Sequence, residues 1–586
     1  MSITHVFRRI GGLCLSVVLA LNLCVSAGAA EQPDRAQSRQ EDLDFLYDTL
    51  KAWHPNLFAN TPESVFLERK SAIEARLETE SDTEFTLDLQ SLASLARDSH
   101  TQISIGGIAD KAHFYPFALS WFDGRWVLST AVQSQQTLLG AEVTAVNGRT
   151  MAQTLEQFRM LLSADNDVKL RRQYRQSCNV AELYEYVGIA GPGQALTLAL
   201  KTAGGQVRTL SAEPLTAEDL MKESLSSLSE QRSAAPATAA ENVCYLSKEL
   251  NDTMYYIQYN RCQEDPQLPM EDFAAAVWSD LDTHAYQRVI VDLRNNGGGS
   301  DGVIWPLLEV LRDFAARENQ QILCLIGETT FSSAIINAVE LQEMGAVLVG
   351  EPTSGSVDHF GSVKSFVLPN SGIQAGVSSK YMDLGTLLDA AAGKGVEPLM
   401  PDIAAPQTLE DELAGKDSCL EYLTAHTEVL RQKERPEAPL TRGRFIGQIH
   451  QSAAPLFAGN SGVLDGSYDL PPFMDLLGIE WFLHPLNWAY QRGVALGSGD
   501  GTFSAAREIT WQEAAVFLIR AASALELRPD PVRAASLPAV LVDGAWDRTA
   551  LEQARSWGLL PEGADFSKTP TQAQGLAMAQ RLLSFA

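Results

Sequence analysis

The sequence predicts a multidomain α/β protein, and three observations support this fold class. The chain has 586 residues, which is too many for one hydrophobic core. Between residues 244 and 430, apolar strand-like runs alternate with amphipathic helical segments, as in a parallel sheet with crossover helices. The segments on either side of this region have different periodicities, so we expect them to fold as separate domains.

The first 30 residues have the features of a secretory signal peptide. Arg8 and Arg9 precede an apolar run over residues 13–25, and small residues lead to Ala30, after which we expect cleavage. No later segment has the roughly 20 consecutive apolar residues that a membrane-spanning helix needs. The sequence therefore predicts an exported protein that does not span a membrane.

The composition argues against several classes of function. The net charge is −28, or −30 once the two arginines of the leader are removed, and such a surface repels nucleic acid. We expect no cofactor, because the glycine-rich segment of the core lacks the Gly-Lys-Ser/Thr of a phosphate-binding loop. The cysteines after the leader are odd in number and widely spaced, so they indicate neither a metal site nor an assignable disulfide. They are Cys178, Cys244, Cys262, Cys324 and Cys419.

Changes of periodicity along the chain predict the domain boundaries. A helical cap comes first, in which Leu43, Phe45, Leu46 and Leu50 share a face. Short strand-like runs, a Ser- and Ala-rich linker, the α/β core, a second linker and a repeat region follow. The expected boundaries are 1–30 for the signal peptide, 31–112 for the cap, 113–223 for a small β-rich domain, 224–243 for the first linker, 244–430 for the core, 431–475 for the second linker and 476–586 for α-helical repeats.

Two motifs of the core follow strands. The strand over residues 289–293 continues into a glycine-rich turn that contains Gly299, and the strand over residues 321–326 leads to the segment TTFSSAIINA. In parallel α/β sheets, ligands bind beyond the carboxyl ends of the strands. We therefore expect the glycine-rich turn to lie beside the two adjacent serines of the second motif, Ser332 and Ser333.

Two interpretations of these hydroxyl groups are open from the residues alone. Thr330, Ser332 or Ser333 caps the following helix, because hydroxyl oxygens accept hydrogen bonds from first-turn N–H groups. Alternatively, Ser332 is a nucleophile for acyl transfer, and its base is His100, whose imidazole titrates near neutral pH. The N–H groups of Gly299 and Ser333 then serve as donors to an oxyanion. A purely structural interpretation stays open for two of these residues as well. His100 would then be a surface or capping residue, and Gly299 would be part of a plain loop.

The chain resembles the C-terminal processing (tail-specific) serine peptidases and their tricorn-core relatives from about residue 41 to 405. The resemblance implies a ClpP/crotonase-like core and a degenerate PDZ-like domain over residues 113–223. It also implies Ser332 as the nucleophile and the amides of Gly299 and Ser333 as the oxyanion hole. The motifs that carry it are Arg97-Asp-Ser-His-Thr101, Val143–Gly148, Val291-Asp-Leu-Arg-Asn-Asn-Gly-Gly-Gly299, Thr330-Phe-Ser-Ser-Ala334, Val349-Gly-Glu-Pro-Thr353 and Gly395-Val-Glu-Pro-Leu-Met-Pro-Asp402.

The sequence departs from this family at the base. The tail-specific branch has a lysine where this chain has Ser356, so the resemblance favours the tricorn-like arrangement, in which Ser99 and His100 match a Ser-His pair of the cap. Activity should then rise with pH through the imidazole range. The third member of that arrangement is a Glu, for which Asp389 and Glu397 are the candidates here. Three further residues are candidates to assist the reaction: Lys364, Lys380 and His359.

The C-terminal repeats resemble S-layer homology modules, which bind cell-wall polysaccharide. Three positions of a first unit recur approximately in a weaker second unit, namely Trp488, Phe503 and Thr510 as Trp546, Phe566 and Thr571. The resemblance implies a wall tether that folds as its own unit and takes no part in the chemistry. A helical accessory domain without this role is the alternative.

Together these features predict an exported serine endopeptidase at the cell wall of a Gram-positive-type bacterium. Its partners would be a peptide or protein substrate and wall polysaccharide, and it would use Ser332 and His100. An alternative from another class is a catalytically inactive surface protein on the same fold that binds peptides or the wall. A fluorophosphonate distinguishes the two, because only an activated serine reacts with it.

Overall fold

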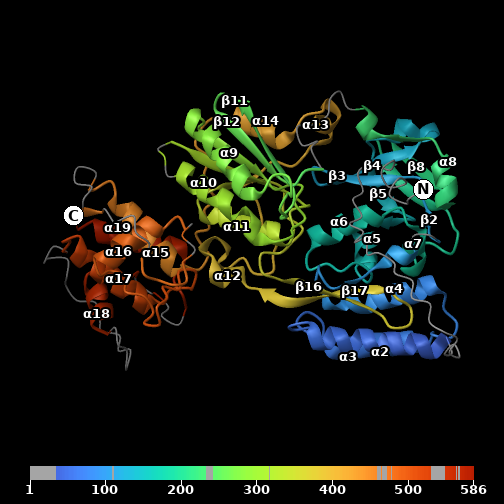
Figure 1. Cartoon of the computed structure of the whole chain (residues 1–586), viewed down its shortest axis with the longest axis horizontal. Coiled ribbons are helices and arrows are strands. Elements are labelled where there is room, and N and C mark those ends of the chain that lie inside the picture. Colours follow the sequence, from blue (N-terminus) through green and yellow to red (C-terminus); the bar gives the residue numbers. More distant parts are fainter. Residues whose placement is uncertain are drawn as a thin grey trace.

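The structure is a computed structural model of the chain, and it divides into four units (Figure 1). We call them the cap (residues 35–103), the β unit (113–231), the core (242–430) and the C-terminal unit (436–585). The signal peptide expected over residues 1–30 lies outside the described residues. The structure describes residues 35–585 except 109–110, 232–241, 316, 318, 458–462, 465–470, 477, 479, 529–547, 562–563 and 565–567.

The cap is a set of three helices, as the sequence predicts. Leu43, Leu46 and Leu50 are fully buried along one face of α2, whereas Phe45 is 42% exposed. The expectation for Phe45 was wrong because the buried face follows the spacing i, i+3, i+7, from which position 45 is displaced. The elements are α2 (Arg35–Trp53), α3 (Glu63–Glu74), α4 (Asp82–Ala93), η1 (Ser94–Ala96) and β1 (Gln102–Ile103).

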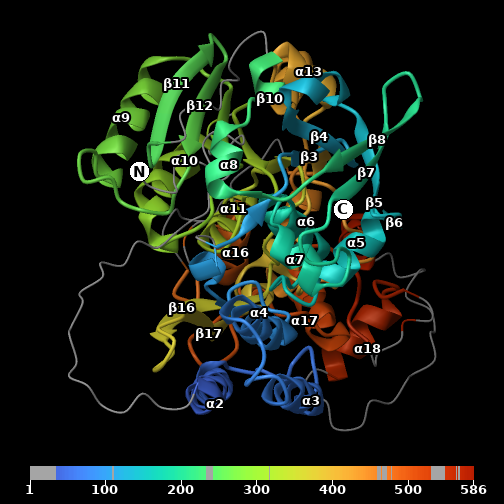
Figure 2. The ribbon, with the colours of Figure 1, turned by 90° about the vertical axis from the view of Figure 1, so that its right-hand side faces the viewer.

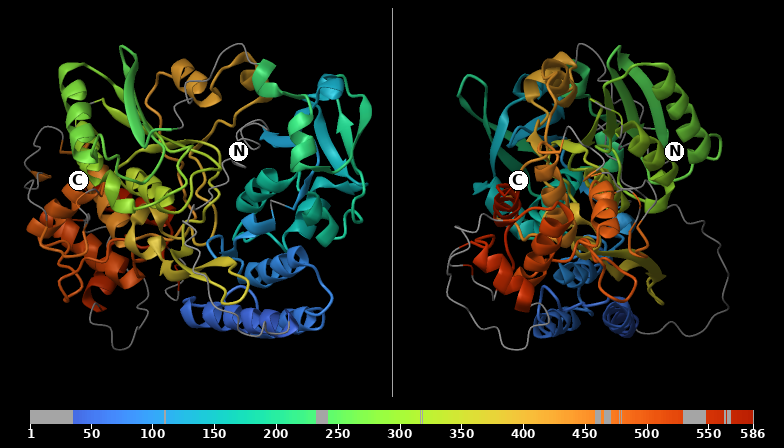
Figure 3. Two further views of the ribbon diagram at one scale, coloured as in Figure 1. Left: turned by 45° about the vertical axis from the view of Figure 1, so that its right-hand side comes forward. Right: turned by 90° about the vertical axis from the view of Figure 1, so that its left-hand side faces the viewer.

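A long hairpin joins the core to the cap. It consists of β16 (His359–Val367) and β17 (Gln374–Met382), and it forms an antiparallel sheet with β1 in the order β1-β17-β16. At its tip, the backbone N–H groups of Asn370 and Ser371 both donate to Asp42 of α2 at 2.8 Å. Figures 1 and 3 show the hairpin reaching from the core to the cap helices. The hairpin begins at His359, so it links the cap directly to the region of the predicted site.

The β unit contains a seven-stranded antiparallel sheet with the order β10-β4-β5-β7-β8, to which β3 and β6 add at the sides (Figure 2). The strand-like runs of the sequence are confirmed, and the start of the first expected linker forms strand β10 instead. The sequence did not predict the four α-helices described in this unit, of which α6 contacts the core. The elements are β2 (His113–Phe114), β3 (Ala118–Phe122), β4 (Arg125–Val132), β5 (Glu142–Val146), β6 (Arg149–Thr150), α5 (Met151–Phe158), α6 (Asp167–Ser177), α7 (Ala181–Tyr186), β7 (Leu196–Lys201), β8 (Val207–Ala212), β9 (Leu215–Thr216), α8 (Ala217–Lys222) and β10 (Leu225–Ser227).

The core is a six-stranded sheet with the order β11-β12-β13-β14-β15-β18. All neighbours except β11 and β12 are parallel, which confirms the predicted crossover pattern. Helices α9, α10 and α11 pack on one face of the sheet and α14 on the other. The elements are β11 (Tyr245–Asn251), β12 (Met254–Tyr259), α9 (Met270–Thr283), β13 (Arg288–Asp292), η5 (Asp301–Ile304), α10 (Trp305–Ala315), β14 (Gln321–Ile326), α11 (Ser333–Glu343), β15 (Val347–Gly350), α12 (Leu384–Leu387), η6 (Asp389–Ala391), β18 (Ile403–Ala404), α13 (Leu409–Ala414) and α14 (Ser418–Ala425).

The C-terminal unit begins earlier than the sequence analysis expects. The interval 431–475, expected as a linker, contains α15 (Arg442–Ala453), which packs in the same apolar cluster as the later helices. The glycines that suggested a linker serve close packing instead. A Cβ on Gly443 would lie 2.7 Å from the ring of Phe482, and one on Gly447 would lie 2.2 Å from Trp481. The later helices are α16 (Leu483–Gln491), α17 (Trp511–Ala524), α18 (Arg548–Ser556) and α19 (Gln572–Leu583).

Three helices of this unit begin in the same way. Thr441, Thr510 and Thr571 are the N-caps of α15, α17 and α19, and each hydroxyl accepts a first-turn N–H. The segments before them also pair, since Ile509 N–H donates to Leu440 O at 2.9 Å. The unit therefore has three similar Thr-capped helices, one more than the sequence repeat reveals. Trp546 and Phe566 lie outside the described residues.

The C-terminal unit contacts the core at the end of α11. The N–H of Trp481 donates to Glu343 O at 3.0 Å, while Asp389 of the core accepts the hydroxyl of Thr441 and pairs with Arg444 at 2.7 Å. Burial, together with the nearby Asp389 carboxylate, raises the pKa of Glu343 well above its usual range. These contacts join the two units through buried polar groups. Figure 3 shows the two units side by side.

The structure also bears on the cysteines and on membrane-spanning helices. The five cysteines that follow the leader are all buried and unpaired. Among the described residues, no helix has both the length and the apolar character needed to span a bilayer.

We predict that Arg444→Met lowers the free energy of unfolding by about 3 kcal/mol, because it leaves Asp389 buried without its cation. Urea denaturation of the full chain measures this loss. Arg431→Met is the matched control, since Arg431 is exposed. Equal stability of the two variants would show that the Asp389–Arg444 pair does not hold the units together.

Candidate active site

Ser332 occupies a strained turn between β14 and α11. Its backbone has φ 54° and ψ −130°, a conformation that a non-glycine residue rarely adopts and that costs about 1–3 kcal/mol. Although it is the N-cap of α11 by position, its side chain accepts no N–H of the first turn. The capping interpretation of Ser332 therefore fails, and the turn leaves a half-buried hydroxyl free at a helix N-terminus.

The other two hydroxyls of the motif hold this turn in place. Thr330 Oγ1 donates to Leu293 O at 2.9 Å and accepts the N–H of Gly327 at 3.1 Å. Ser333 Oγ donates to Gly299 O at 2.8 Å. Both bonds connect the turn after β14 to the segment after β13, as expected for two neighbouring parallel strands. Neither hydroxyl is available as a nucleophile in this arrangement.

The glycine-rich turn approaches Ser332 so closely that side chains are excluded. A Cβ on Gly298, where φ is +100°, would lie 2.7 Å from Ser332 Cβ. A Cβ on Gly299, where φ is +141°, would lie 2.2 Å from Cys262 O. Only glycine combines these backbone angles with this space. The sequence motif of three glycines is therefore explained by close contact with the serine turn and with the Cys262 segment.

Two backbone N–H groups next to Ser332 are free. Gly299 forms a parallel bridge with Cys262 through the groups on either side of it: Cys262 N–H donates to Gly298 O at 3.2 Å and Ser300 N–H donates to Cys262 O at 2.7 Å. The N–H and C=O of Gly299 therefore face away from Cys262, and its C=O meets Ser333 Oγ. Ser333 N–H begins α11. No hydrogen bond among the described residues uses either N–H, so both can donate to an anionic oxygen at the positive end of a helix.

His100 is buried beside this turn. Its ring stacks on Phe331, the residue before Ser332, with centroids 4.5 Å apart and an interplanar angle of 21°. The His100 ring also stacks on the ring of His359, with centroids 5.6 Å apart and an interplanar angle of 17°. His359 Nδ1 lies 3.0 Å from Ser356 O, so this nitrogen donates its proton to that carbonyl. The structure thus brings His100 and the assisting candidate His359 to one place.

Burial makes His100 a neutral base. It lowers the pKa of His100 to about 3; the Asp98 carboxylate acts in the opposite direction, and the charges of His359 and Lys169 add to the decrease. The imidazole is therefore neutral above this value, and a neutral imidazole has a nitrogen that can accept a proton. The transition expected in the ordinary imidazole range therefore moves to more acidic pH.

Asp98 is the carboxylate at His100, and the sequence analysis did not single it out. Its Oδ1 accepts the backbone N–H of His100 at 3.0 Å and lies 3.9 Å from His100 Nδ1. Thr101 and Ser378 donate to its Oδ2, each at 2.6 Å. Burial acts to raise the pKa of Asp98, but His54, the hydroxyls and His100 overcome this effect and lower it. The available signal was its position two residues before His100 in the same motif.

The structure places the two candidate third members elsewhere. Asp389 is bound by Thr441 and Arg444 of the C-terminal unit. Glu397 has an exposed side chain, and its carbonyl oxygen accepts Val357 N–H at 2.9 Å. Neither contacts His100. Both were chosen from their distance along the chain, which does not reveal how the segment after the hairpin folds.

The remaining polar candidates also lie away from the Ser332 hydroxyl. The Ser99 hydroxyl donates to Asp165 of the β unit rather than pointing at Ser332. Ser356 is fully buried, and its hydroxyl accepts Asn166 Nδ2 at 3.0 Å. Lys364 and Lys380 are exposed on the hairpin, where Lys364 lies over Trp53. None of these lysines is placed to serve Ser332.

Another lysine reaches the site from an unexpected direction. Lys169 belongs to α6 of the β unit, is 5% exposed, and has its Nζ 3.3 Å from the centre of the Phe331 ring. Burial lowers the pKa of Lys169 to about 7, Arg172 adds to this effect, and Asp165 and Asp98 oppose it. The sequence analysis missed Lys169 because it expected only strands in the β unit.

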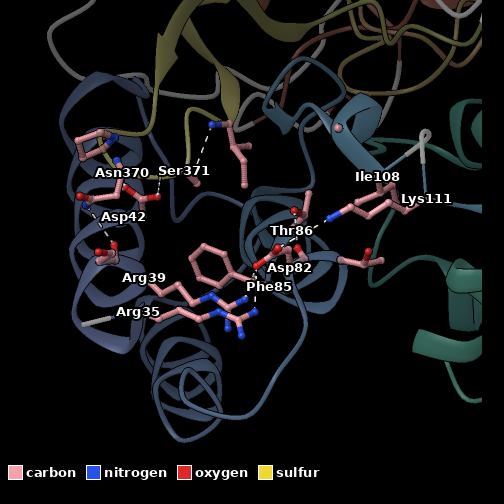
Figure 4. A pocket seen from close by; sticks show the side chains of 15 residues that line it. Arg35, Arg39, Asp42, Asp82, Phe85, Thr86, Ile108, Lys111, Asn370 and Ser371 are labelled. Carbon is pink, nitrogen blue, oxygen red and sulfur yellow. Dashed lines mark hydrogen bonds and ion pairs between the residues drawn. The ribbon is translucent and has the colours of Figure 1, made fainter. Parts of the chain in front are cut away.

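A separate cavity of about 650 Å³ lies between the cap helices and the hairpin tip (Figure 4). Arg35 and Arg39 both point to Asp82 across it, at 3.0 and 2.8 Å, so their charges are largely paired. None of the candidate catalytic residues lines this cavity. Within the described ranges, no group of three or more His, Cys, Asp or Glu side chains is arranged to hold a metal ion.

Comparisons with known proteins give remote structural likenesses. No family model and no curated protein matches the chain. Mature CPAF aligns at 15% identity with a TM-score of 0.46, over 66% of this chain and 96% of its own. The photosystem II D1 C-terminal processing protease aligns at 12% identity with a TM-score of 0.31, over 65% of this chain and 98% of its own. The tricorn protease aligns at 15% identity with a TM-score of 0.30, over 66% of this chain and 36% of its own. Since these TM-scores are below 0.5, the function has to be argued from the site itself.

We predict that Gly298→Ala lowers the unfolding temperature more than Gly297→Ala does. A methyl group at position 298 collides with Ser332, and the backbone there holds alanine in a left-handed conformation that it rarely adopts. A methyl group at position 297 meets no atom within 4 Å. Thermal denaturation of both variants measures the difference. Equal unfolding temperatures would show that the contact between the glycine turn and Ser332 is not tight.

Proposed function

We propose that the protein is a serine endopeptidase in which Ser332 is the nucleophile. The observation that carries this proposal is the free hydroxyl of Ser332, held in a strained turn next to two unbonded backbone N–H groups. A cap, which is the ordinary role of serine at this position, would use the hydroxyl on the helix itself. Strain of this kind is retained where the surrounding structure fixes a reactive group.

In the proposed reaction, His100 removes the proton from Ser332 Oγ as the oxygen attacks the carbonyl carbon of a peptide bond. The carbonyl oxygen becomes an oxyanion and is bound by the N–H groups of Gly299 and Ser333. His100 then donates its proton to the leaving amine, and water hydrolyses the acyl-enzyme by the same sequence in reverse. The neutral state of buried His100 suits the first of these steps.

Asp98 is the residue that we assign as the third member of this arrangement. It carries a negative charge in a buried position and faces His100 Nδ1, so it favours the imidazolium that forms during attack. The 3.9 Å separation is longer than a hydrogen bond, and closure by about 1 Å would form one. Bonds from Thr101 and Ser378 fix the carboxylate, so this closure is a movement of His100.

A catalytically inactive surface protein on the same fold is the second candidate. It is favoured by one observation, namely that neither ring nitrogen of His100 forms a hydrogen bond of ordinary geometry, including with Ser332. Hydrogen bonds between catalytic groups are often long in the absence of substrate, so this observation is compatible with both functions. Peptide hydrolysis decides between them.

We predict that Ser332→Ala abolishes hydrolysis of an unstructured protein substrate, while Ser333→Ala, the matched control, retains at least a tenth of the rate. Loss of the nucleophile leaves only the residual acceleration from substrate binding and the oxyanion hole. Because His100 is active when neutral and its pKa is about 3, the acidic decline of kcat/KM attributable to His100 should lie below pH 5. Hydrolysis by Ser332→Ala equal to that of the wild type would refute the assignment.

For the C-terminal unit, we propose a tether to cell-wall polysaccharide in an exported protein of a Gram-positive-type bacterium. The three Thr-capped helices with their own apolar core support a repeat module of this kind. Trp488 and Trp511 are buried in that core, so they do not supply an aromatic binding surface. Contacts would come from polar groups, because the net charge of −28 disfavours simple adhesion to an anionic wall.

We predict that the full chain after its leader sediments with purified Gram-positive cell walls and stays bound at 0.5 M salt, where long-range charge interactions are screened. Residues 31–435 serve as the comparison and should remain in the supernatant. Release of the full chain by moderate salt, or sedimentation of both chains alike, would contradict specific binding by the C-terminal unit.

A further inference from the structure

Four side chains form one continuous stack through the proposed site. His359 and Phe331 lie on either side of His100, at 5.6 and 4.5 Å between ring centroids. Lys169 Nζ lies 3.3 Å from the centre of the Phe331 ring. An ammonium group and an imidazole ring at these distances cannot share one face of a phenyl ring, so Lys169 and His100 contact opposite faces. The order of the stack is Lys169, Phe331, His100, His359.

The position of Lys169 is unusual for a lysine. It is 5% exposed, and among the described residues no carboxylate lies within 4 Å of its Nζ. A buried ammonium without an ion pair is strongly disfavoured unless another group replaces its hydration. The face of the Phe331 ring is the group that does so here, as a cation–π contact. The Phe331 ring therefore supports the charge of Lys169 at contact distance, and Asp165 and Asp98 support it from farther away.

His100 does not reach its proposed partners in this arrangement of the stack. His100 Nδ1 is 3.9 Å from Asp98 Oδ1, and Ser332 forms no hydrogen bond with the ring. The Asp98 carboxylate itself is fixed by Thr101 and Ser378. The catalytic arrangement therefore needs a shift of the His100 ring, and the stacked Phe331 ring opposes that shift from one side.

We infer that Lys169 is a positioning residue of the active site, whose ammonium group fixes the Phe331 ring through a cation–π contact, so that the stacked ring keeps His100 out of register with Ser332 and Asp98. This inference rests on the proposed peptidase function. Lys169 touches neither Ser332 nor His100, so it acts through Phe331. When Lys169 loses its proton, the cation–π contact is lost, Phe331 is held less firmly, and His100 closes onto its partners.

The charged surroundings of Lys169 set the pH at which this happens. Asp165 from the loop before α6 and Asp98 from the cap favour the ammonium form. Arg172 on the next turn of α6 disfavours it, and burial disfavours it most, so that the pKa falls to about 7. The titratable groups of the opposing elements are His100 of the cap and His359 of the hairpin. The cation–π contact between Lys169 and Phe331 thus weakens as pH rises through about 7.

The test is the pH dependence of kcat/KM for Ser332-dependent hydrolysis between pH 5 and 9. For the wild type we expect a rise of about tenfold centred near pH 7, the size of one desolvated cation–π contact. Lys169→Met should show the upper value throughout, because its side chain fills the same space without charge. Lys169→Arg should keep the lower value up to pH 9, because a guanidinium stays protonated. The matched control is Lys201→Met, an exposed lysine of the β unit, which should follow the wild type.

Phe331→Leu gives a second test that does not replace the lysine, and it too should lack the step near pH 7. Loss of activity in Lys169→Met at every pH with the fold intact by circular dichroism, or a step near pH 7 that persists in both Lys169→Met and Phe331→Leu, would overturn the inference. Failure of the proposed function is recognised separately, since hydrolysis would then persist in Ser332→Ala or be absent from the wild type.

Discussion

The proposed site depends on the left-handed turn at Ser332. This conformation costs about 1–3 kcal/mol, so neighbouring contacts have to impose it. Phe331 N–H donates to Asn296 O at 3.1 Å, and Thr330 binds the end of the β13 segment. Gly298 then leaves just enough space for the serine. Because β13 and β14 are parallel neighbours, both halves of this clamp emerge at the same edge of the sheet.

A second constraint is the exclusion of water around His100. Burial removes the stabilisation that water gives to an imidazolium, so the ring stays neutral well below its ordinary pKa. The same environment lowers the pKa of Lys169, whose ammonium group contacts the face of an aromatic ring, while Asp165 and Asp98 favour its charge from farther away. The cap, the core and the β unit each contribute one side of this enclosure. The environment of the proposed base therefore depends on how the units pack together.

The order of the units and the core sheet could be predicted from the sequence, because apolar periodicity and turn residues report local structure directly. The same is true of Ser332 and Gly299, which follow strands whose neighbours are set by the crossover rule. Asp98, Asp165 and Lys169 could not be placed in this way. Their roles depend on contacts between separate units, and Lys169 lies on a helix inside a region whose pattern indicated only strands.

In the C-terminal unit, the sequence suggested a linker where the structure has a packed helix. Glycine and proline between residues 431 and 475 suggested a flexible connection, but Gly443 and Gly447 allow aromatic rings to pack against α15. The unit then contacts Glu343, the last residue of α11, whose first residue follows Ser332. One helix thus runs from the proposed nucleophile to the boundary with the C-terminal unit.

The proposed function requires that His100 activates Ser332 and no other hydroxyl of the motif. The most direct measurement is mass-spectrometric mapping of the adduct formed by a fluorophosphonate on the full chain. We expect a single adduct on Ser332 that is lost in His100→Ala, while the fold of that variant is retained. An adduct on Ser333, undiminished labelling in His100→Ala, or no adduct at all would contradict it.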